Sequence, residues 1–109
     1  MLVTIPFRGY FKNRMVTGKK IATSRTRKYG KQGDRFRVFG VEFEIISVDR
    51  MMLGDVAKMF HLHEGFLTAE DFLDCWASIH PKAKFDLTVP VWFHQFKMAD
   101  AEVFGEESK

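Results

Sequence analysis

The alternation of apolar and polar residues predicts two adjacent strands near the middle of the chain. Residues 35–39 (RFRVF) place Phe36 and Val38 on one face and charged residues between them, and residues 41–48 (VEFEIISV) alternate in the same way. Successive side chains of a strand point to opposite faces, so a period of two is typical of half-buried strands. Gly40 separates the two runs and suits a tight turn. The pattern therefore predicts a β-hairpin.

Three further runs also predict strands. Residues 2–6 (LVTIP) are rich in β-branched residues and end at a proline, and residues 21–25 (IATSR) follow a glycine and two lysines. Residues 88–97 (TVPVWFHQFK) alternate again, and Pro90 indicates an edge position or a bulge there, because proline donates no hydrogen bond to a sheet. Between the second strand and the hairpin, residues 26–33 (TRKYGKQG) predict a polar, basic loop.

Helical spacing of apolar residues predicts three helices. The first covers residues 7–17 and ends at Gly18, and the second is centred on residues 53–60. The third begins at Thr68, where the hydroxyl can cap the helix with Asp71 three residues later, and it ends before a proline at position 81. This succession of elements predicts an α+β domain over residues 1–98, a small mixed β-barrel with helical insertions, followed by a tail at residues 99–109. The residues expected to be most buried are Ile21, Phe36, Val38, Phe43, Ile45, Phe72, Trp76, Val91 and Phe93.

Composition restricts the class of protein. A chain of 109 residues with 46% hydrophobic residues can form one core without disulfides. Cys75 is the single cysteine and has no internal disulfide partner, which fits a reducing compartment. No run approaches the ~20 apolar residues that a membrane span requires, and there is no secretory signal pattern. We therefore expect a cytoplasmic protein without a membrane partner.

The charges are unevenly distributed along the chain. Residues 1–37 contain eleven Lys or Arg and a single acid, Asp34, whereas residues 38–109 contain six Lys or Arg and thirteen acids. Such asymmetry indicates a surface for an anionic partner, of which nucleic acid is the commonest. The alternative is that the two halves of the domain attract each other and that the remaining charges are simply solvated.

One motif connects these features to a known family. The stretch GKKIATSR at residues 18–25, the GD at residues 33–34 and the segment HLHEGFLTAEDFLDCWASIHP at residues 61–81 resemble the ASCH domain, a branch of the PUA-like β-barrel superfamily. The resemblance covers residues 1–98 in register. It implies a PUA-like barrel with a basic cleft built around residues 18–25, and RNA, a nucleotide or a modified nucleoside as the partner.

Some small bacterial ASCH proteins remove the acetyl group from N4-acetylcytidine. The resemblance implies that Lys20, Thr23 and Glu64 occupy their catalytic positions. A threonine hydroxyl needs a base to take its proton, and a lysine can be that base only if burial and neighbouring cations lower its pKa. A carboxylate could then protonate the departing amine. The alternative is that Lys20 and Glu64 form a structural ion pair, with Thr23 satisfied locally.

A second set of residues is typical of phosphate binding. Cations interleaved with one aromatic residue suit a groove that follows a nucleic-acid backbone, with a ring on which a base can stack. The alternative is a solvated loop. The residues of this set are Lys19, Arg25, Arg27, Lys28, Tyr29 and Lys31.

A metal site is a weaker possibility. His61, His63 and Glu64 could contribute zinc ligands, but the sequence supplies no second cluster, and His80 and His94 stand alone. We therefore expect neither a metal nor a cofactor. Tryptophans Trp76 and Trp92 are expected to be core residues first and base-stacking surfaces second.

Three hypotheses follow from the sequence. The first is a module that binds RNA or a nucleotide through its basic half, and the second is an amidohydrolase that deacetylates N4-acetylcytidine-like nucleosides. The third is an interaction domain for an acidic protein. The sequence does not decide whether the chain is an enzyme, and it gives no oligomeric state. Convergence of Lys20, Thr23 and Glu64 on one site would favour the second hypothesis over the first.

Overall fold

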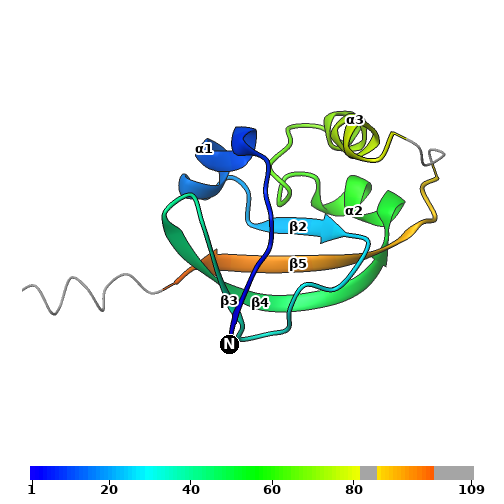
Figure 1. Cartoon of the computed structure of the whole chain (residues 1–109). Coiled ribbons are helices and arrows are strands. Elements are labelled where there is room, and N and C mark those ends of the chain that lie inside the picture. The colour runs from blue at the N-terminus through cyan, green and yellow to red at the C-terminus, as the bar shows by residue number, and fades with distance from the viewer. Residues whose placement is uncertain (82–85, 100–109) are drawn as a thin grey trace, which may run out of the picture.

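The chain folds into a curved, mixed five-stranded sheet with its helices gathered on the β2 side (Figure 1). The computed structural model describes residues 1–81 and 86–99. Neighbouring strands follow the order β1-β3-β4-β5-β2, in which only the β1–β3 pair is parallel. The strands are β1 (Leu2–Val3), β2 (Ala22–Arg25), β3 (Arg35–Val38), β4 (Val41–Met52) and β5 (Pro90–Met98).

The predicted hairpin is confirmed. Strands β3 and β4 pair antiparallel, and the turn between them consists of Phe39 and Gly40, both with positive φ (57° and 76°). Two consecutive positive φ angles are typical of the two-residue turn that best matches strand twist. Strand β4 continues to Met52, beyond the predicted end at residue 48, because its second half pairs with β5 from Val48 to Met52.

The helices lie close to their predicted positions. In α3 (Ala69–Ile79), the Thr68 hydroxyl accepts a hydrogen bond from the Asp71 N–H at 3.0 Å, so the predicted cap is confirmed. Helix α2 spans Leu53–Phe60. The first predicted helix is shorter than expected and consists of a 3-10 turn, η1 (Gly9–Phe11), followed by α1 (Lys12–Val16).

The prediction of a closed β-barrel is wrong, whereas the α+β class and the mixed sheet are confirmed. Strands β1 and β2 are the two edges of the sheet, and no ladder joins them in the described residues. Non-strand segments hold the residues just before β2: Lys20 N–H donates to Arg14 O at 2.8 Å, and Ile21 N–H donates to His63 O at 2.8 Å. The edge strand is thus anchored at its start without closure of the sheet. Of the predicted tail, only Ala99 lies within the described residues.

Most of the predicted core is confirmed. Phe36, Phe43, Ile45, Phe72, Val91 and Phe93 are all buried. Ile21 was predicted to be buried, but it is 38% exposed, so this prediction is wrong. The residue lies just outside β2, where its backbone N–H donates to His63 O and its backbone O accepts from the Phe96 N–H. Val38 and Trp76 are half-buried rather than buried. Across the described residues, no helix is both long enough and apolar enough to cross a bilayer.

Candidate functional site

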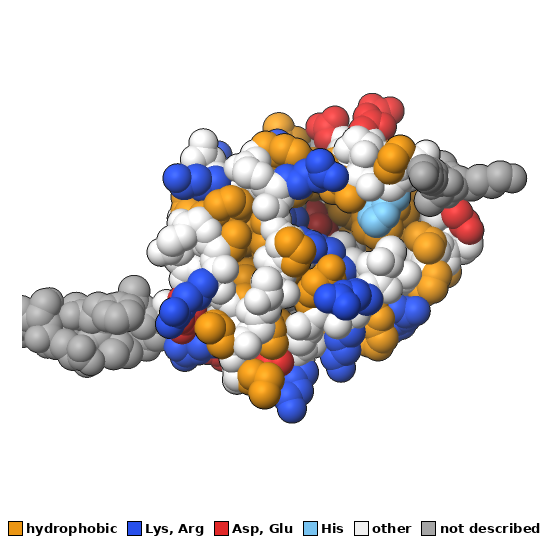
Figure 2. All heavy atoms as spheres, in the orientation of Figure 1, with side chains coloured by type: hydrophobic (Ala, Val, Ile, Leu, Met, Phe, Trp, Pro, Cys, Tyr) orange, Lys and Arg blue, Asp and Glu red, His pale blue; other side chains and the backbone are white. Residues whose placement is uncertain are grey.

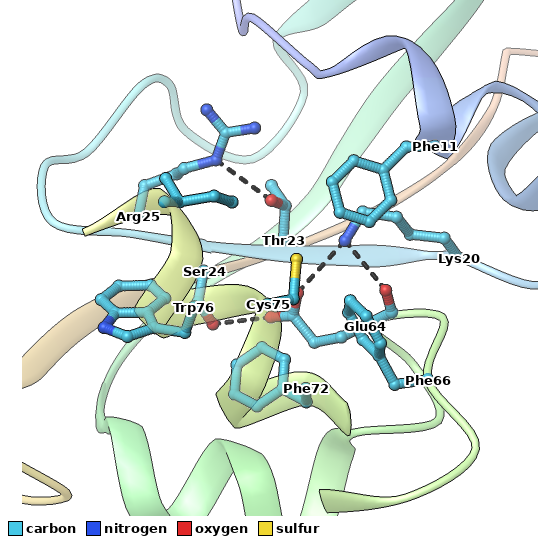
Figure 3. A pocket seen from close by; sticks show the side chains of 11 residues that line it. Phe11, Lys20, Thr23, Ser24, Arg25, Glu64, Phe66, Phe72, Cys75 and Trp76 are labelled. Atoms are coloured by element: carbon cyan, nitrogen blue, oxygen red, sulfur yellow. Dashed lines mark hydrogen bonds and ion pairs between the residues drawn. The ribbon is translucent and has the colours of Figure 1, made fainter. Parts of the chain in front are cut away.

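A small pocket opens beside β2, where that strand meets η1, α3 and the turn after α2 (Figure 3). Its volume is about 50 Å³. Five polar or charged residues line it, together with the rings of Phe11, Phe66, Phe72 and Trp76; the five are Lys20, Thr23, Ser24, Arg25 and Glu64. Figure 2 shows the molecule hollowed on this face, with an acidic side chain inside the hollow and Lys or Arg side chains beside it.

Lys20 and Glu64 form an ion pair inside the pocket. The Lys20 Nζ lies 3.2 Å from Glu64 Oε1, and it also donates to the Glu64 backbone carbonyl at 2.9 Å. Both residues are 2% exposed. Removing two charges from water costs several kcal/mol for each ion, and a pair recovers this only with good geometry and further hydrogen bonds. The pair therefore has to be held accurately by its surroundings.

A tight turn carries Glu64 to this position. The Glu64 N–H donates to Phe60 O at the end of α2, and the next residue, Gly65, has φ +96°. A Cβ atom at Gly65 would lie 3.0 Å from the Lys20 Cβ, so the turn packs directly on the lysine stem. Glycine is required here both for its left-handed backbone and for this close approach.

Burial dominates the electrostatics of Lys20. Desolvation lowers the pKa of its amine below the ordinary lysine value, the charge and hydrogen bond of Glu64 partly oppose this effect, and the charge of Arg25 adds to it. The Nζ atom also lies 4.5 Å from the centre of the Phe11 ring, whose face attracts the ammonium form. A buried amine with a lowered pKa is the form of lysine that can act as a base.

Thr23 lines the same pocket but is bonded elsewhere. Its Oγ1 accepts a hydrogen bond from Arg25 Nε at 3.1 Å, and in the described residues it makes none to Lys20 or Glu64. The structure thus brings the three predicted residues to one pocket, with Lys20 and Glu64 in contact and Thr23 held beside them by Arg25. The same contacts are expected if these residues have a purely structural role, in which Lys20 and Glu64 form an ion pair and a neighbouring residue satisfies the Thr23 hydroxyl.

Ser24 is a site residue that the sequence analysis did not select. Its hydroxyl donates to Glu64 Oε2 at 2.6 Å, so each carboxylate oxygen has its own donor. The signal was available in the sequence, because residues 20 and 24 fall on the same face of an extended segment. The hydroxyl thus supplies a hydrogen bond to the carboxylate oxygen that Lys20 does not contact.

The predicted phosphate-binding residues, apart from Lys19, lie around Tyr29 or in the groove that it lines. Arg25 lies at the pocket, 4.7 Å from the Phe7 ring centre and 5.4 Å from that of Tyr29, and Arg27 lies 4.4 Å from the Tyr29 ring. Lys28, Tyr29 and Lys31 line a separate open groove. Lys19 is exposed and, within the described part of the chain, lines neither the pocket nor this groove.

The sequence analysis missed a stack of Arg50 on Trp92. The Arg50 guanidinium lies 4.6 Å from the Trp92 ring centre, and Lys28 Nζ lies 5.5 Å from it. The basic loop and the central strands therefore share one cationic surface around this ring.

A buried histidine anchors the basic loop to the sheet. The Nε2 of His94 accepts a hydrogen bond from the Tyr29 N–H at 3.1 Å, and its Nδ1 lies 3.0 Å from Trp92 O. A ring nitrogen that accepts an N–H is unprotonated, so this arrangement requires neutral His94. Burial lowers the pKa of His94, which favours that neutral form.

The histidines of the turn after α2 do not assemble a metal site. Within residues 1–81 and 86–99, no three or more His, Cys, Asp or Glu residues gather where a metal ion could bind. His61 Nδ1 lies 2.8 Å from Ala57 O, and the His63 ring packs edge-on against Phe60.

The fold is shared with several solved structures of low sequence identity. An ASCH domain from Lactobacillus crispatus aligns with a TM-score of 0.67 and 16% identity, covering 89% of this chain and 79% of that one. A mutant ASCH protein from Zymomonas mobilis aligns with a TM-score of 0.63 and 14% identity over 96% of this chain and 79% of that one. A protein from Pyrococcus furiosus aligns with a TM-score of 0.67 and 12% identity, covering 92% of this chain and 99% of that one. No family model and no curated protein matches the sequence.

The buried pair makes a specific prediction about stability. We expect Lys20→Met and Glu64→Met each to lower the free energy of unfolding by about 3–5 kcal/mol, because each leaves an uncompensated buried charge. The double variant should lose clearly less than the sum of the two. Urea denaturation of the four proteins measures this coupling.

The exposed pair Arg35–Glu44, at 3.4 Å, is the matched control. Its coupling should not exceed about 1 kcal/mol. Additive losses for Lys20 and Glu64 would contradict a tightly coupled pair.

Proposed function

We propose that this chain, which has the fold of the ASCH domain, is an amidohydrolase that removes a small acyl group from the exocyclic amine of a nucleoside. The observation that carries the proposal is the convergence of Lys20, Thr23 and Glu64 on one pocket, with the amine of Lys20 buried against the carboxylate of Glu64. A base, a hydroxyl nucleophile and a proton donor are the three groups that amide cleavage of this kind requires.

The shape and lining of the pocket support a small acyl group as the part that enters it. A volume of about 50 Å³ is too small for a whole nucleoside. Aromatic side chains, Trp76 among them, form the walls around the polar floor. A planar base can pack against such rings, so the base would lie at the mouth with its acylated amine directed inward.

The chemistry proceeds in two steps. In the fraction of molecules in which Lys20 is neutral, a fraction that burial enlarges by lowering the pKa of its amine, Lys20 takes the proton of the Thr23 hydroxyl, and the Thr23 oxygen forms a bond to the acyl carbon. The bond from that carbon to the amine nitrogen breaks as the proton passes from Lys20 through Glu64 to the nitrogen. Water then attacks the ester on Thr23, which releases the carboxylic acid and restores the hydroxyl. The Lys20–Glu64 contact at 3.2 Å supports the proton transfer between them.

The first step requires the Thr23 hydroxyl to come within hydrogen-bond reach of Lys20. Thr23 is hydrogen-bonded to Arg25 rather than to Lys20, and catalytic hydrogen bonds are often long or absent before substrate binds. The Arg25 N–H donated to the Thr23 oxygen favours the developing alkoxide. Arg25 therefore contributes to activation of the nucleophile in this proposal.

Turnover of N4-acetylcytidine tests the proposal. We expect the purified chain to release cytidine, detected by chromatography, and we expect Lys20→Ala and Thr23→Ala each to lower kcat by at least about 100-fold, since each removes a group from the proton transfer. Ser78→Ala is the matched control, because this exposed hydroxyl of α3 lines no part of the pocket. It should keep full activity.

Circular dichroism of the same variants separates lost chemistry from lost folding. Absence of cytidine with the folded wild-type chain would contradict the proposal. Equal turnover by both variants would contradict the roles of Lys20 and Thr23.

A second function, binding of single-stranded RNA, is supported by the cations stacked on Tyr29 and Trp92. A guanidinium packed on a ring is held in place while its N–H edge stays free for a phosphate. In the described residues, Arg27, Lys28 and Arg50 form no ion pair. Cations already pack on the Tyr29 and Trp92 rings. We therefore expect phosphate contacts to contribute more than base stacking to the affinity for RNA.

The salt dependence of binding tests this second function. Replacing Arg27, Lys28 and Lys31 with Ala should flatten the slope of log affinity against log salt for a short single-stranded RNA by about two to three units, because each of these cations would neutralise one phosphate. Fluorescence anisotropy measures the slope, and Lys58→Ala on α2 is the control.

An unchanged slope would remove the loop from the RNA interface. A parallel titration with polyglutamate distinguishes the third hypothesis: tighter binding to that polymer than to RNA would favour an acidic protein partner.

A further inference from the structure

A second cavity adjoins the pocket on its outer side. It has a volume of about 280 Å³ and is lined by Pro6, Phe7, Arg8, Phe11, Arg25 and Ile79. Phe11, Arg25 and Ile79 also line the inner pocket, so the two cavities share a boundary. A ligand whose end occupies the inner pocket would extend over this boundary into the outer cavity.

Arg25, on the boundary, is a half-buried cation whose guanidinium contacts no carboxylate directly in the described residues, although the charge of Glu64 attracts it from a greater distance. Its Nη2 donates to Pro6 O at 2.6 Å and its Nε to Thr23 Oγ1 at 3.1 Å, and both acceptors are neutral. In the described part of the chain, it forms no ion pair with a carboxylate. Burying a charge is unfavourable unless it is paired, and an anion in the cavity would supply the missing partner. Burial also lowers the pKa of Arg25, in agreement with this incomplete compensation.

Arg8 brings a second guanidinium to the same cavity. It lies in the segment between β1 and η1, is exposed, and has neither a hydrogen bond nor an ion pair to a carboxylate in the described residues. The segments that carry the two arginines are joined by the Arg25–Pro6 hydrogen bond. Guanidinium groups offer forked donors that match phosphate oxygens, so two of them at one cavity suit a phosphate better than a neutral sugar.

We propose that the outer cavity is a phosphate subsite formed by Arg8 and Arg25, and that the preferred substrate is accordingly a nucleotide unit rather than a free nucleoside. The assignment rests on the proposed function for the inner pocket, which takes the acyl group while the base lies at the shared boundary. The phosphate can be the terminal group of a mononucleotide or an internal phosphodiester of an RNA strand. Both present the same anionic oxygens to the two guanidinium groups.

Binding of unreactive ligands tests the subsite without any need for turnover. Isothermal titration calorimetry at low salt should show cytidine 5′-monophosphate binding about tenfold or more tightly than cytidine. Arg8→Gln should abolish this preference and leave the affinity for cytidine unchanged. Lys58→Gln, which removes an exposed cation that lines neither cavity, should leave the preference intact. Equal affinity for the two ligands, binding of neither, or equal weakening of both by Arg8→Gln would overturn the proposal.

Two further comparisons are informative. One distinguishes the two sources of the phosphate, and the other distinguishes failure of the phosphate subsite from failure of the amidohydrolase. The first comparison uses a short RNA with a single central cytidine. If this RNA binds more tightly than the monophosphate and the difference depends on Arg8, the subsite holds a phosphodiester. If the monophosphate binds more tightly than the RNA, the subsite holds the terminal phosphate. If the monophosphate is preferred but N4-acetylcytidine and its 5′-monophosphate are both left intact, the phosphate subsite stands and the amidohydrolase fails. If both acetylated compounds are cleaved with equal kcat/KM, the amidohydrolase stands and the subsite fails.

Discussion

The contact between the ammonium of Lys20 and the carboxylate of Glu64 is the interaction on which the architecture of the site depends. The two residues are 44 positions apart in the sequence and both are withdrawn from water. Two charges in such a place are tolerated only when every donor and acceptor is matched, and here Ser24, the Glu64 carbonyl and the Phe11 ring complete the set. The turn that bears Glu64 is fixed to the start of β2 for the same reason, through the Ile21–His63 hydrogen bond and the close packing of Gly65.

This interaction also explains why the site lies at an edge of the sheet. In the described residues, strand β2 pairs with one strand, β5, and its free edge leaves room for η1, the turn after α2 and α3 to converge. A closed barrel would have used that edge for a strand. The open sheet thus provides a buried polar floor at β2 with aromatic walls above it, and the outer cavity beside Arg25 extends the same site toward solvent.

Local patterns in the sequence were sufficient for the elements that depend on local physics. The hairpin followed from strict alternation around Gly40, and the start of α3 followed from Thr68 and Asp71, because each is determined by a few neighbouring residues. The open sheet did not follow, since closure depends on whether two distant edge strands meet. Ile21 shows the same limit: its apolar side chain predicted a core position, but its place just outside β2 turns it toward solvent. Lys20, Thr23 and Glu64 were predicted by resemblance alone. The Arg50–Trp92 stack became visible only with the strand register, in which Arg25, Trp92 and Arg50 stand side by side.

The most direct test of the buried pair is the titration of the Lys20 amine itself. With lysine labelled by ¹³C at the side chain, the NMR signals can be followed over pH, and Lys20→Met identifies the signal of Lys20. We expect Lys20 to titrate below the ordinary range of lysine, since desolvation outweighs its attraction to Glu64, and we expect Glu64→Gln to lower its pKa further. A Lys20 signal that titrates together with the exposed lysines, unaffected by Glu64→Gln, would contradict the buried pair and with it the chemistry proposed for the pocket.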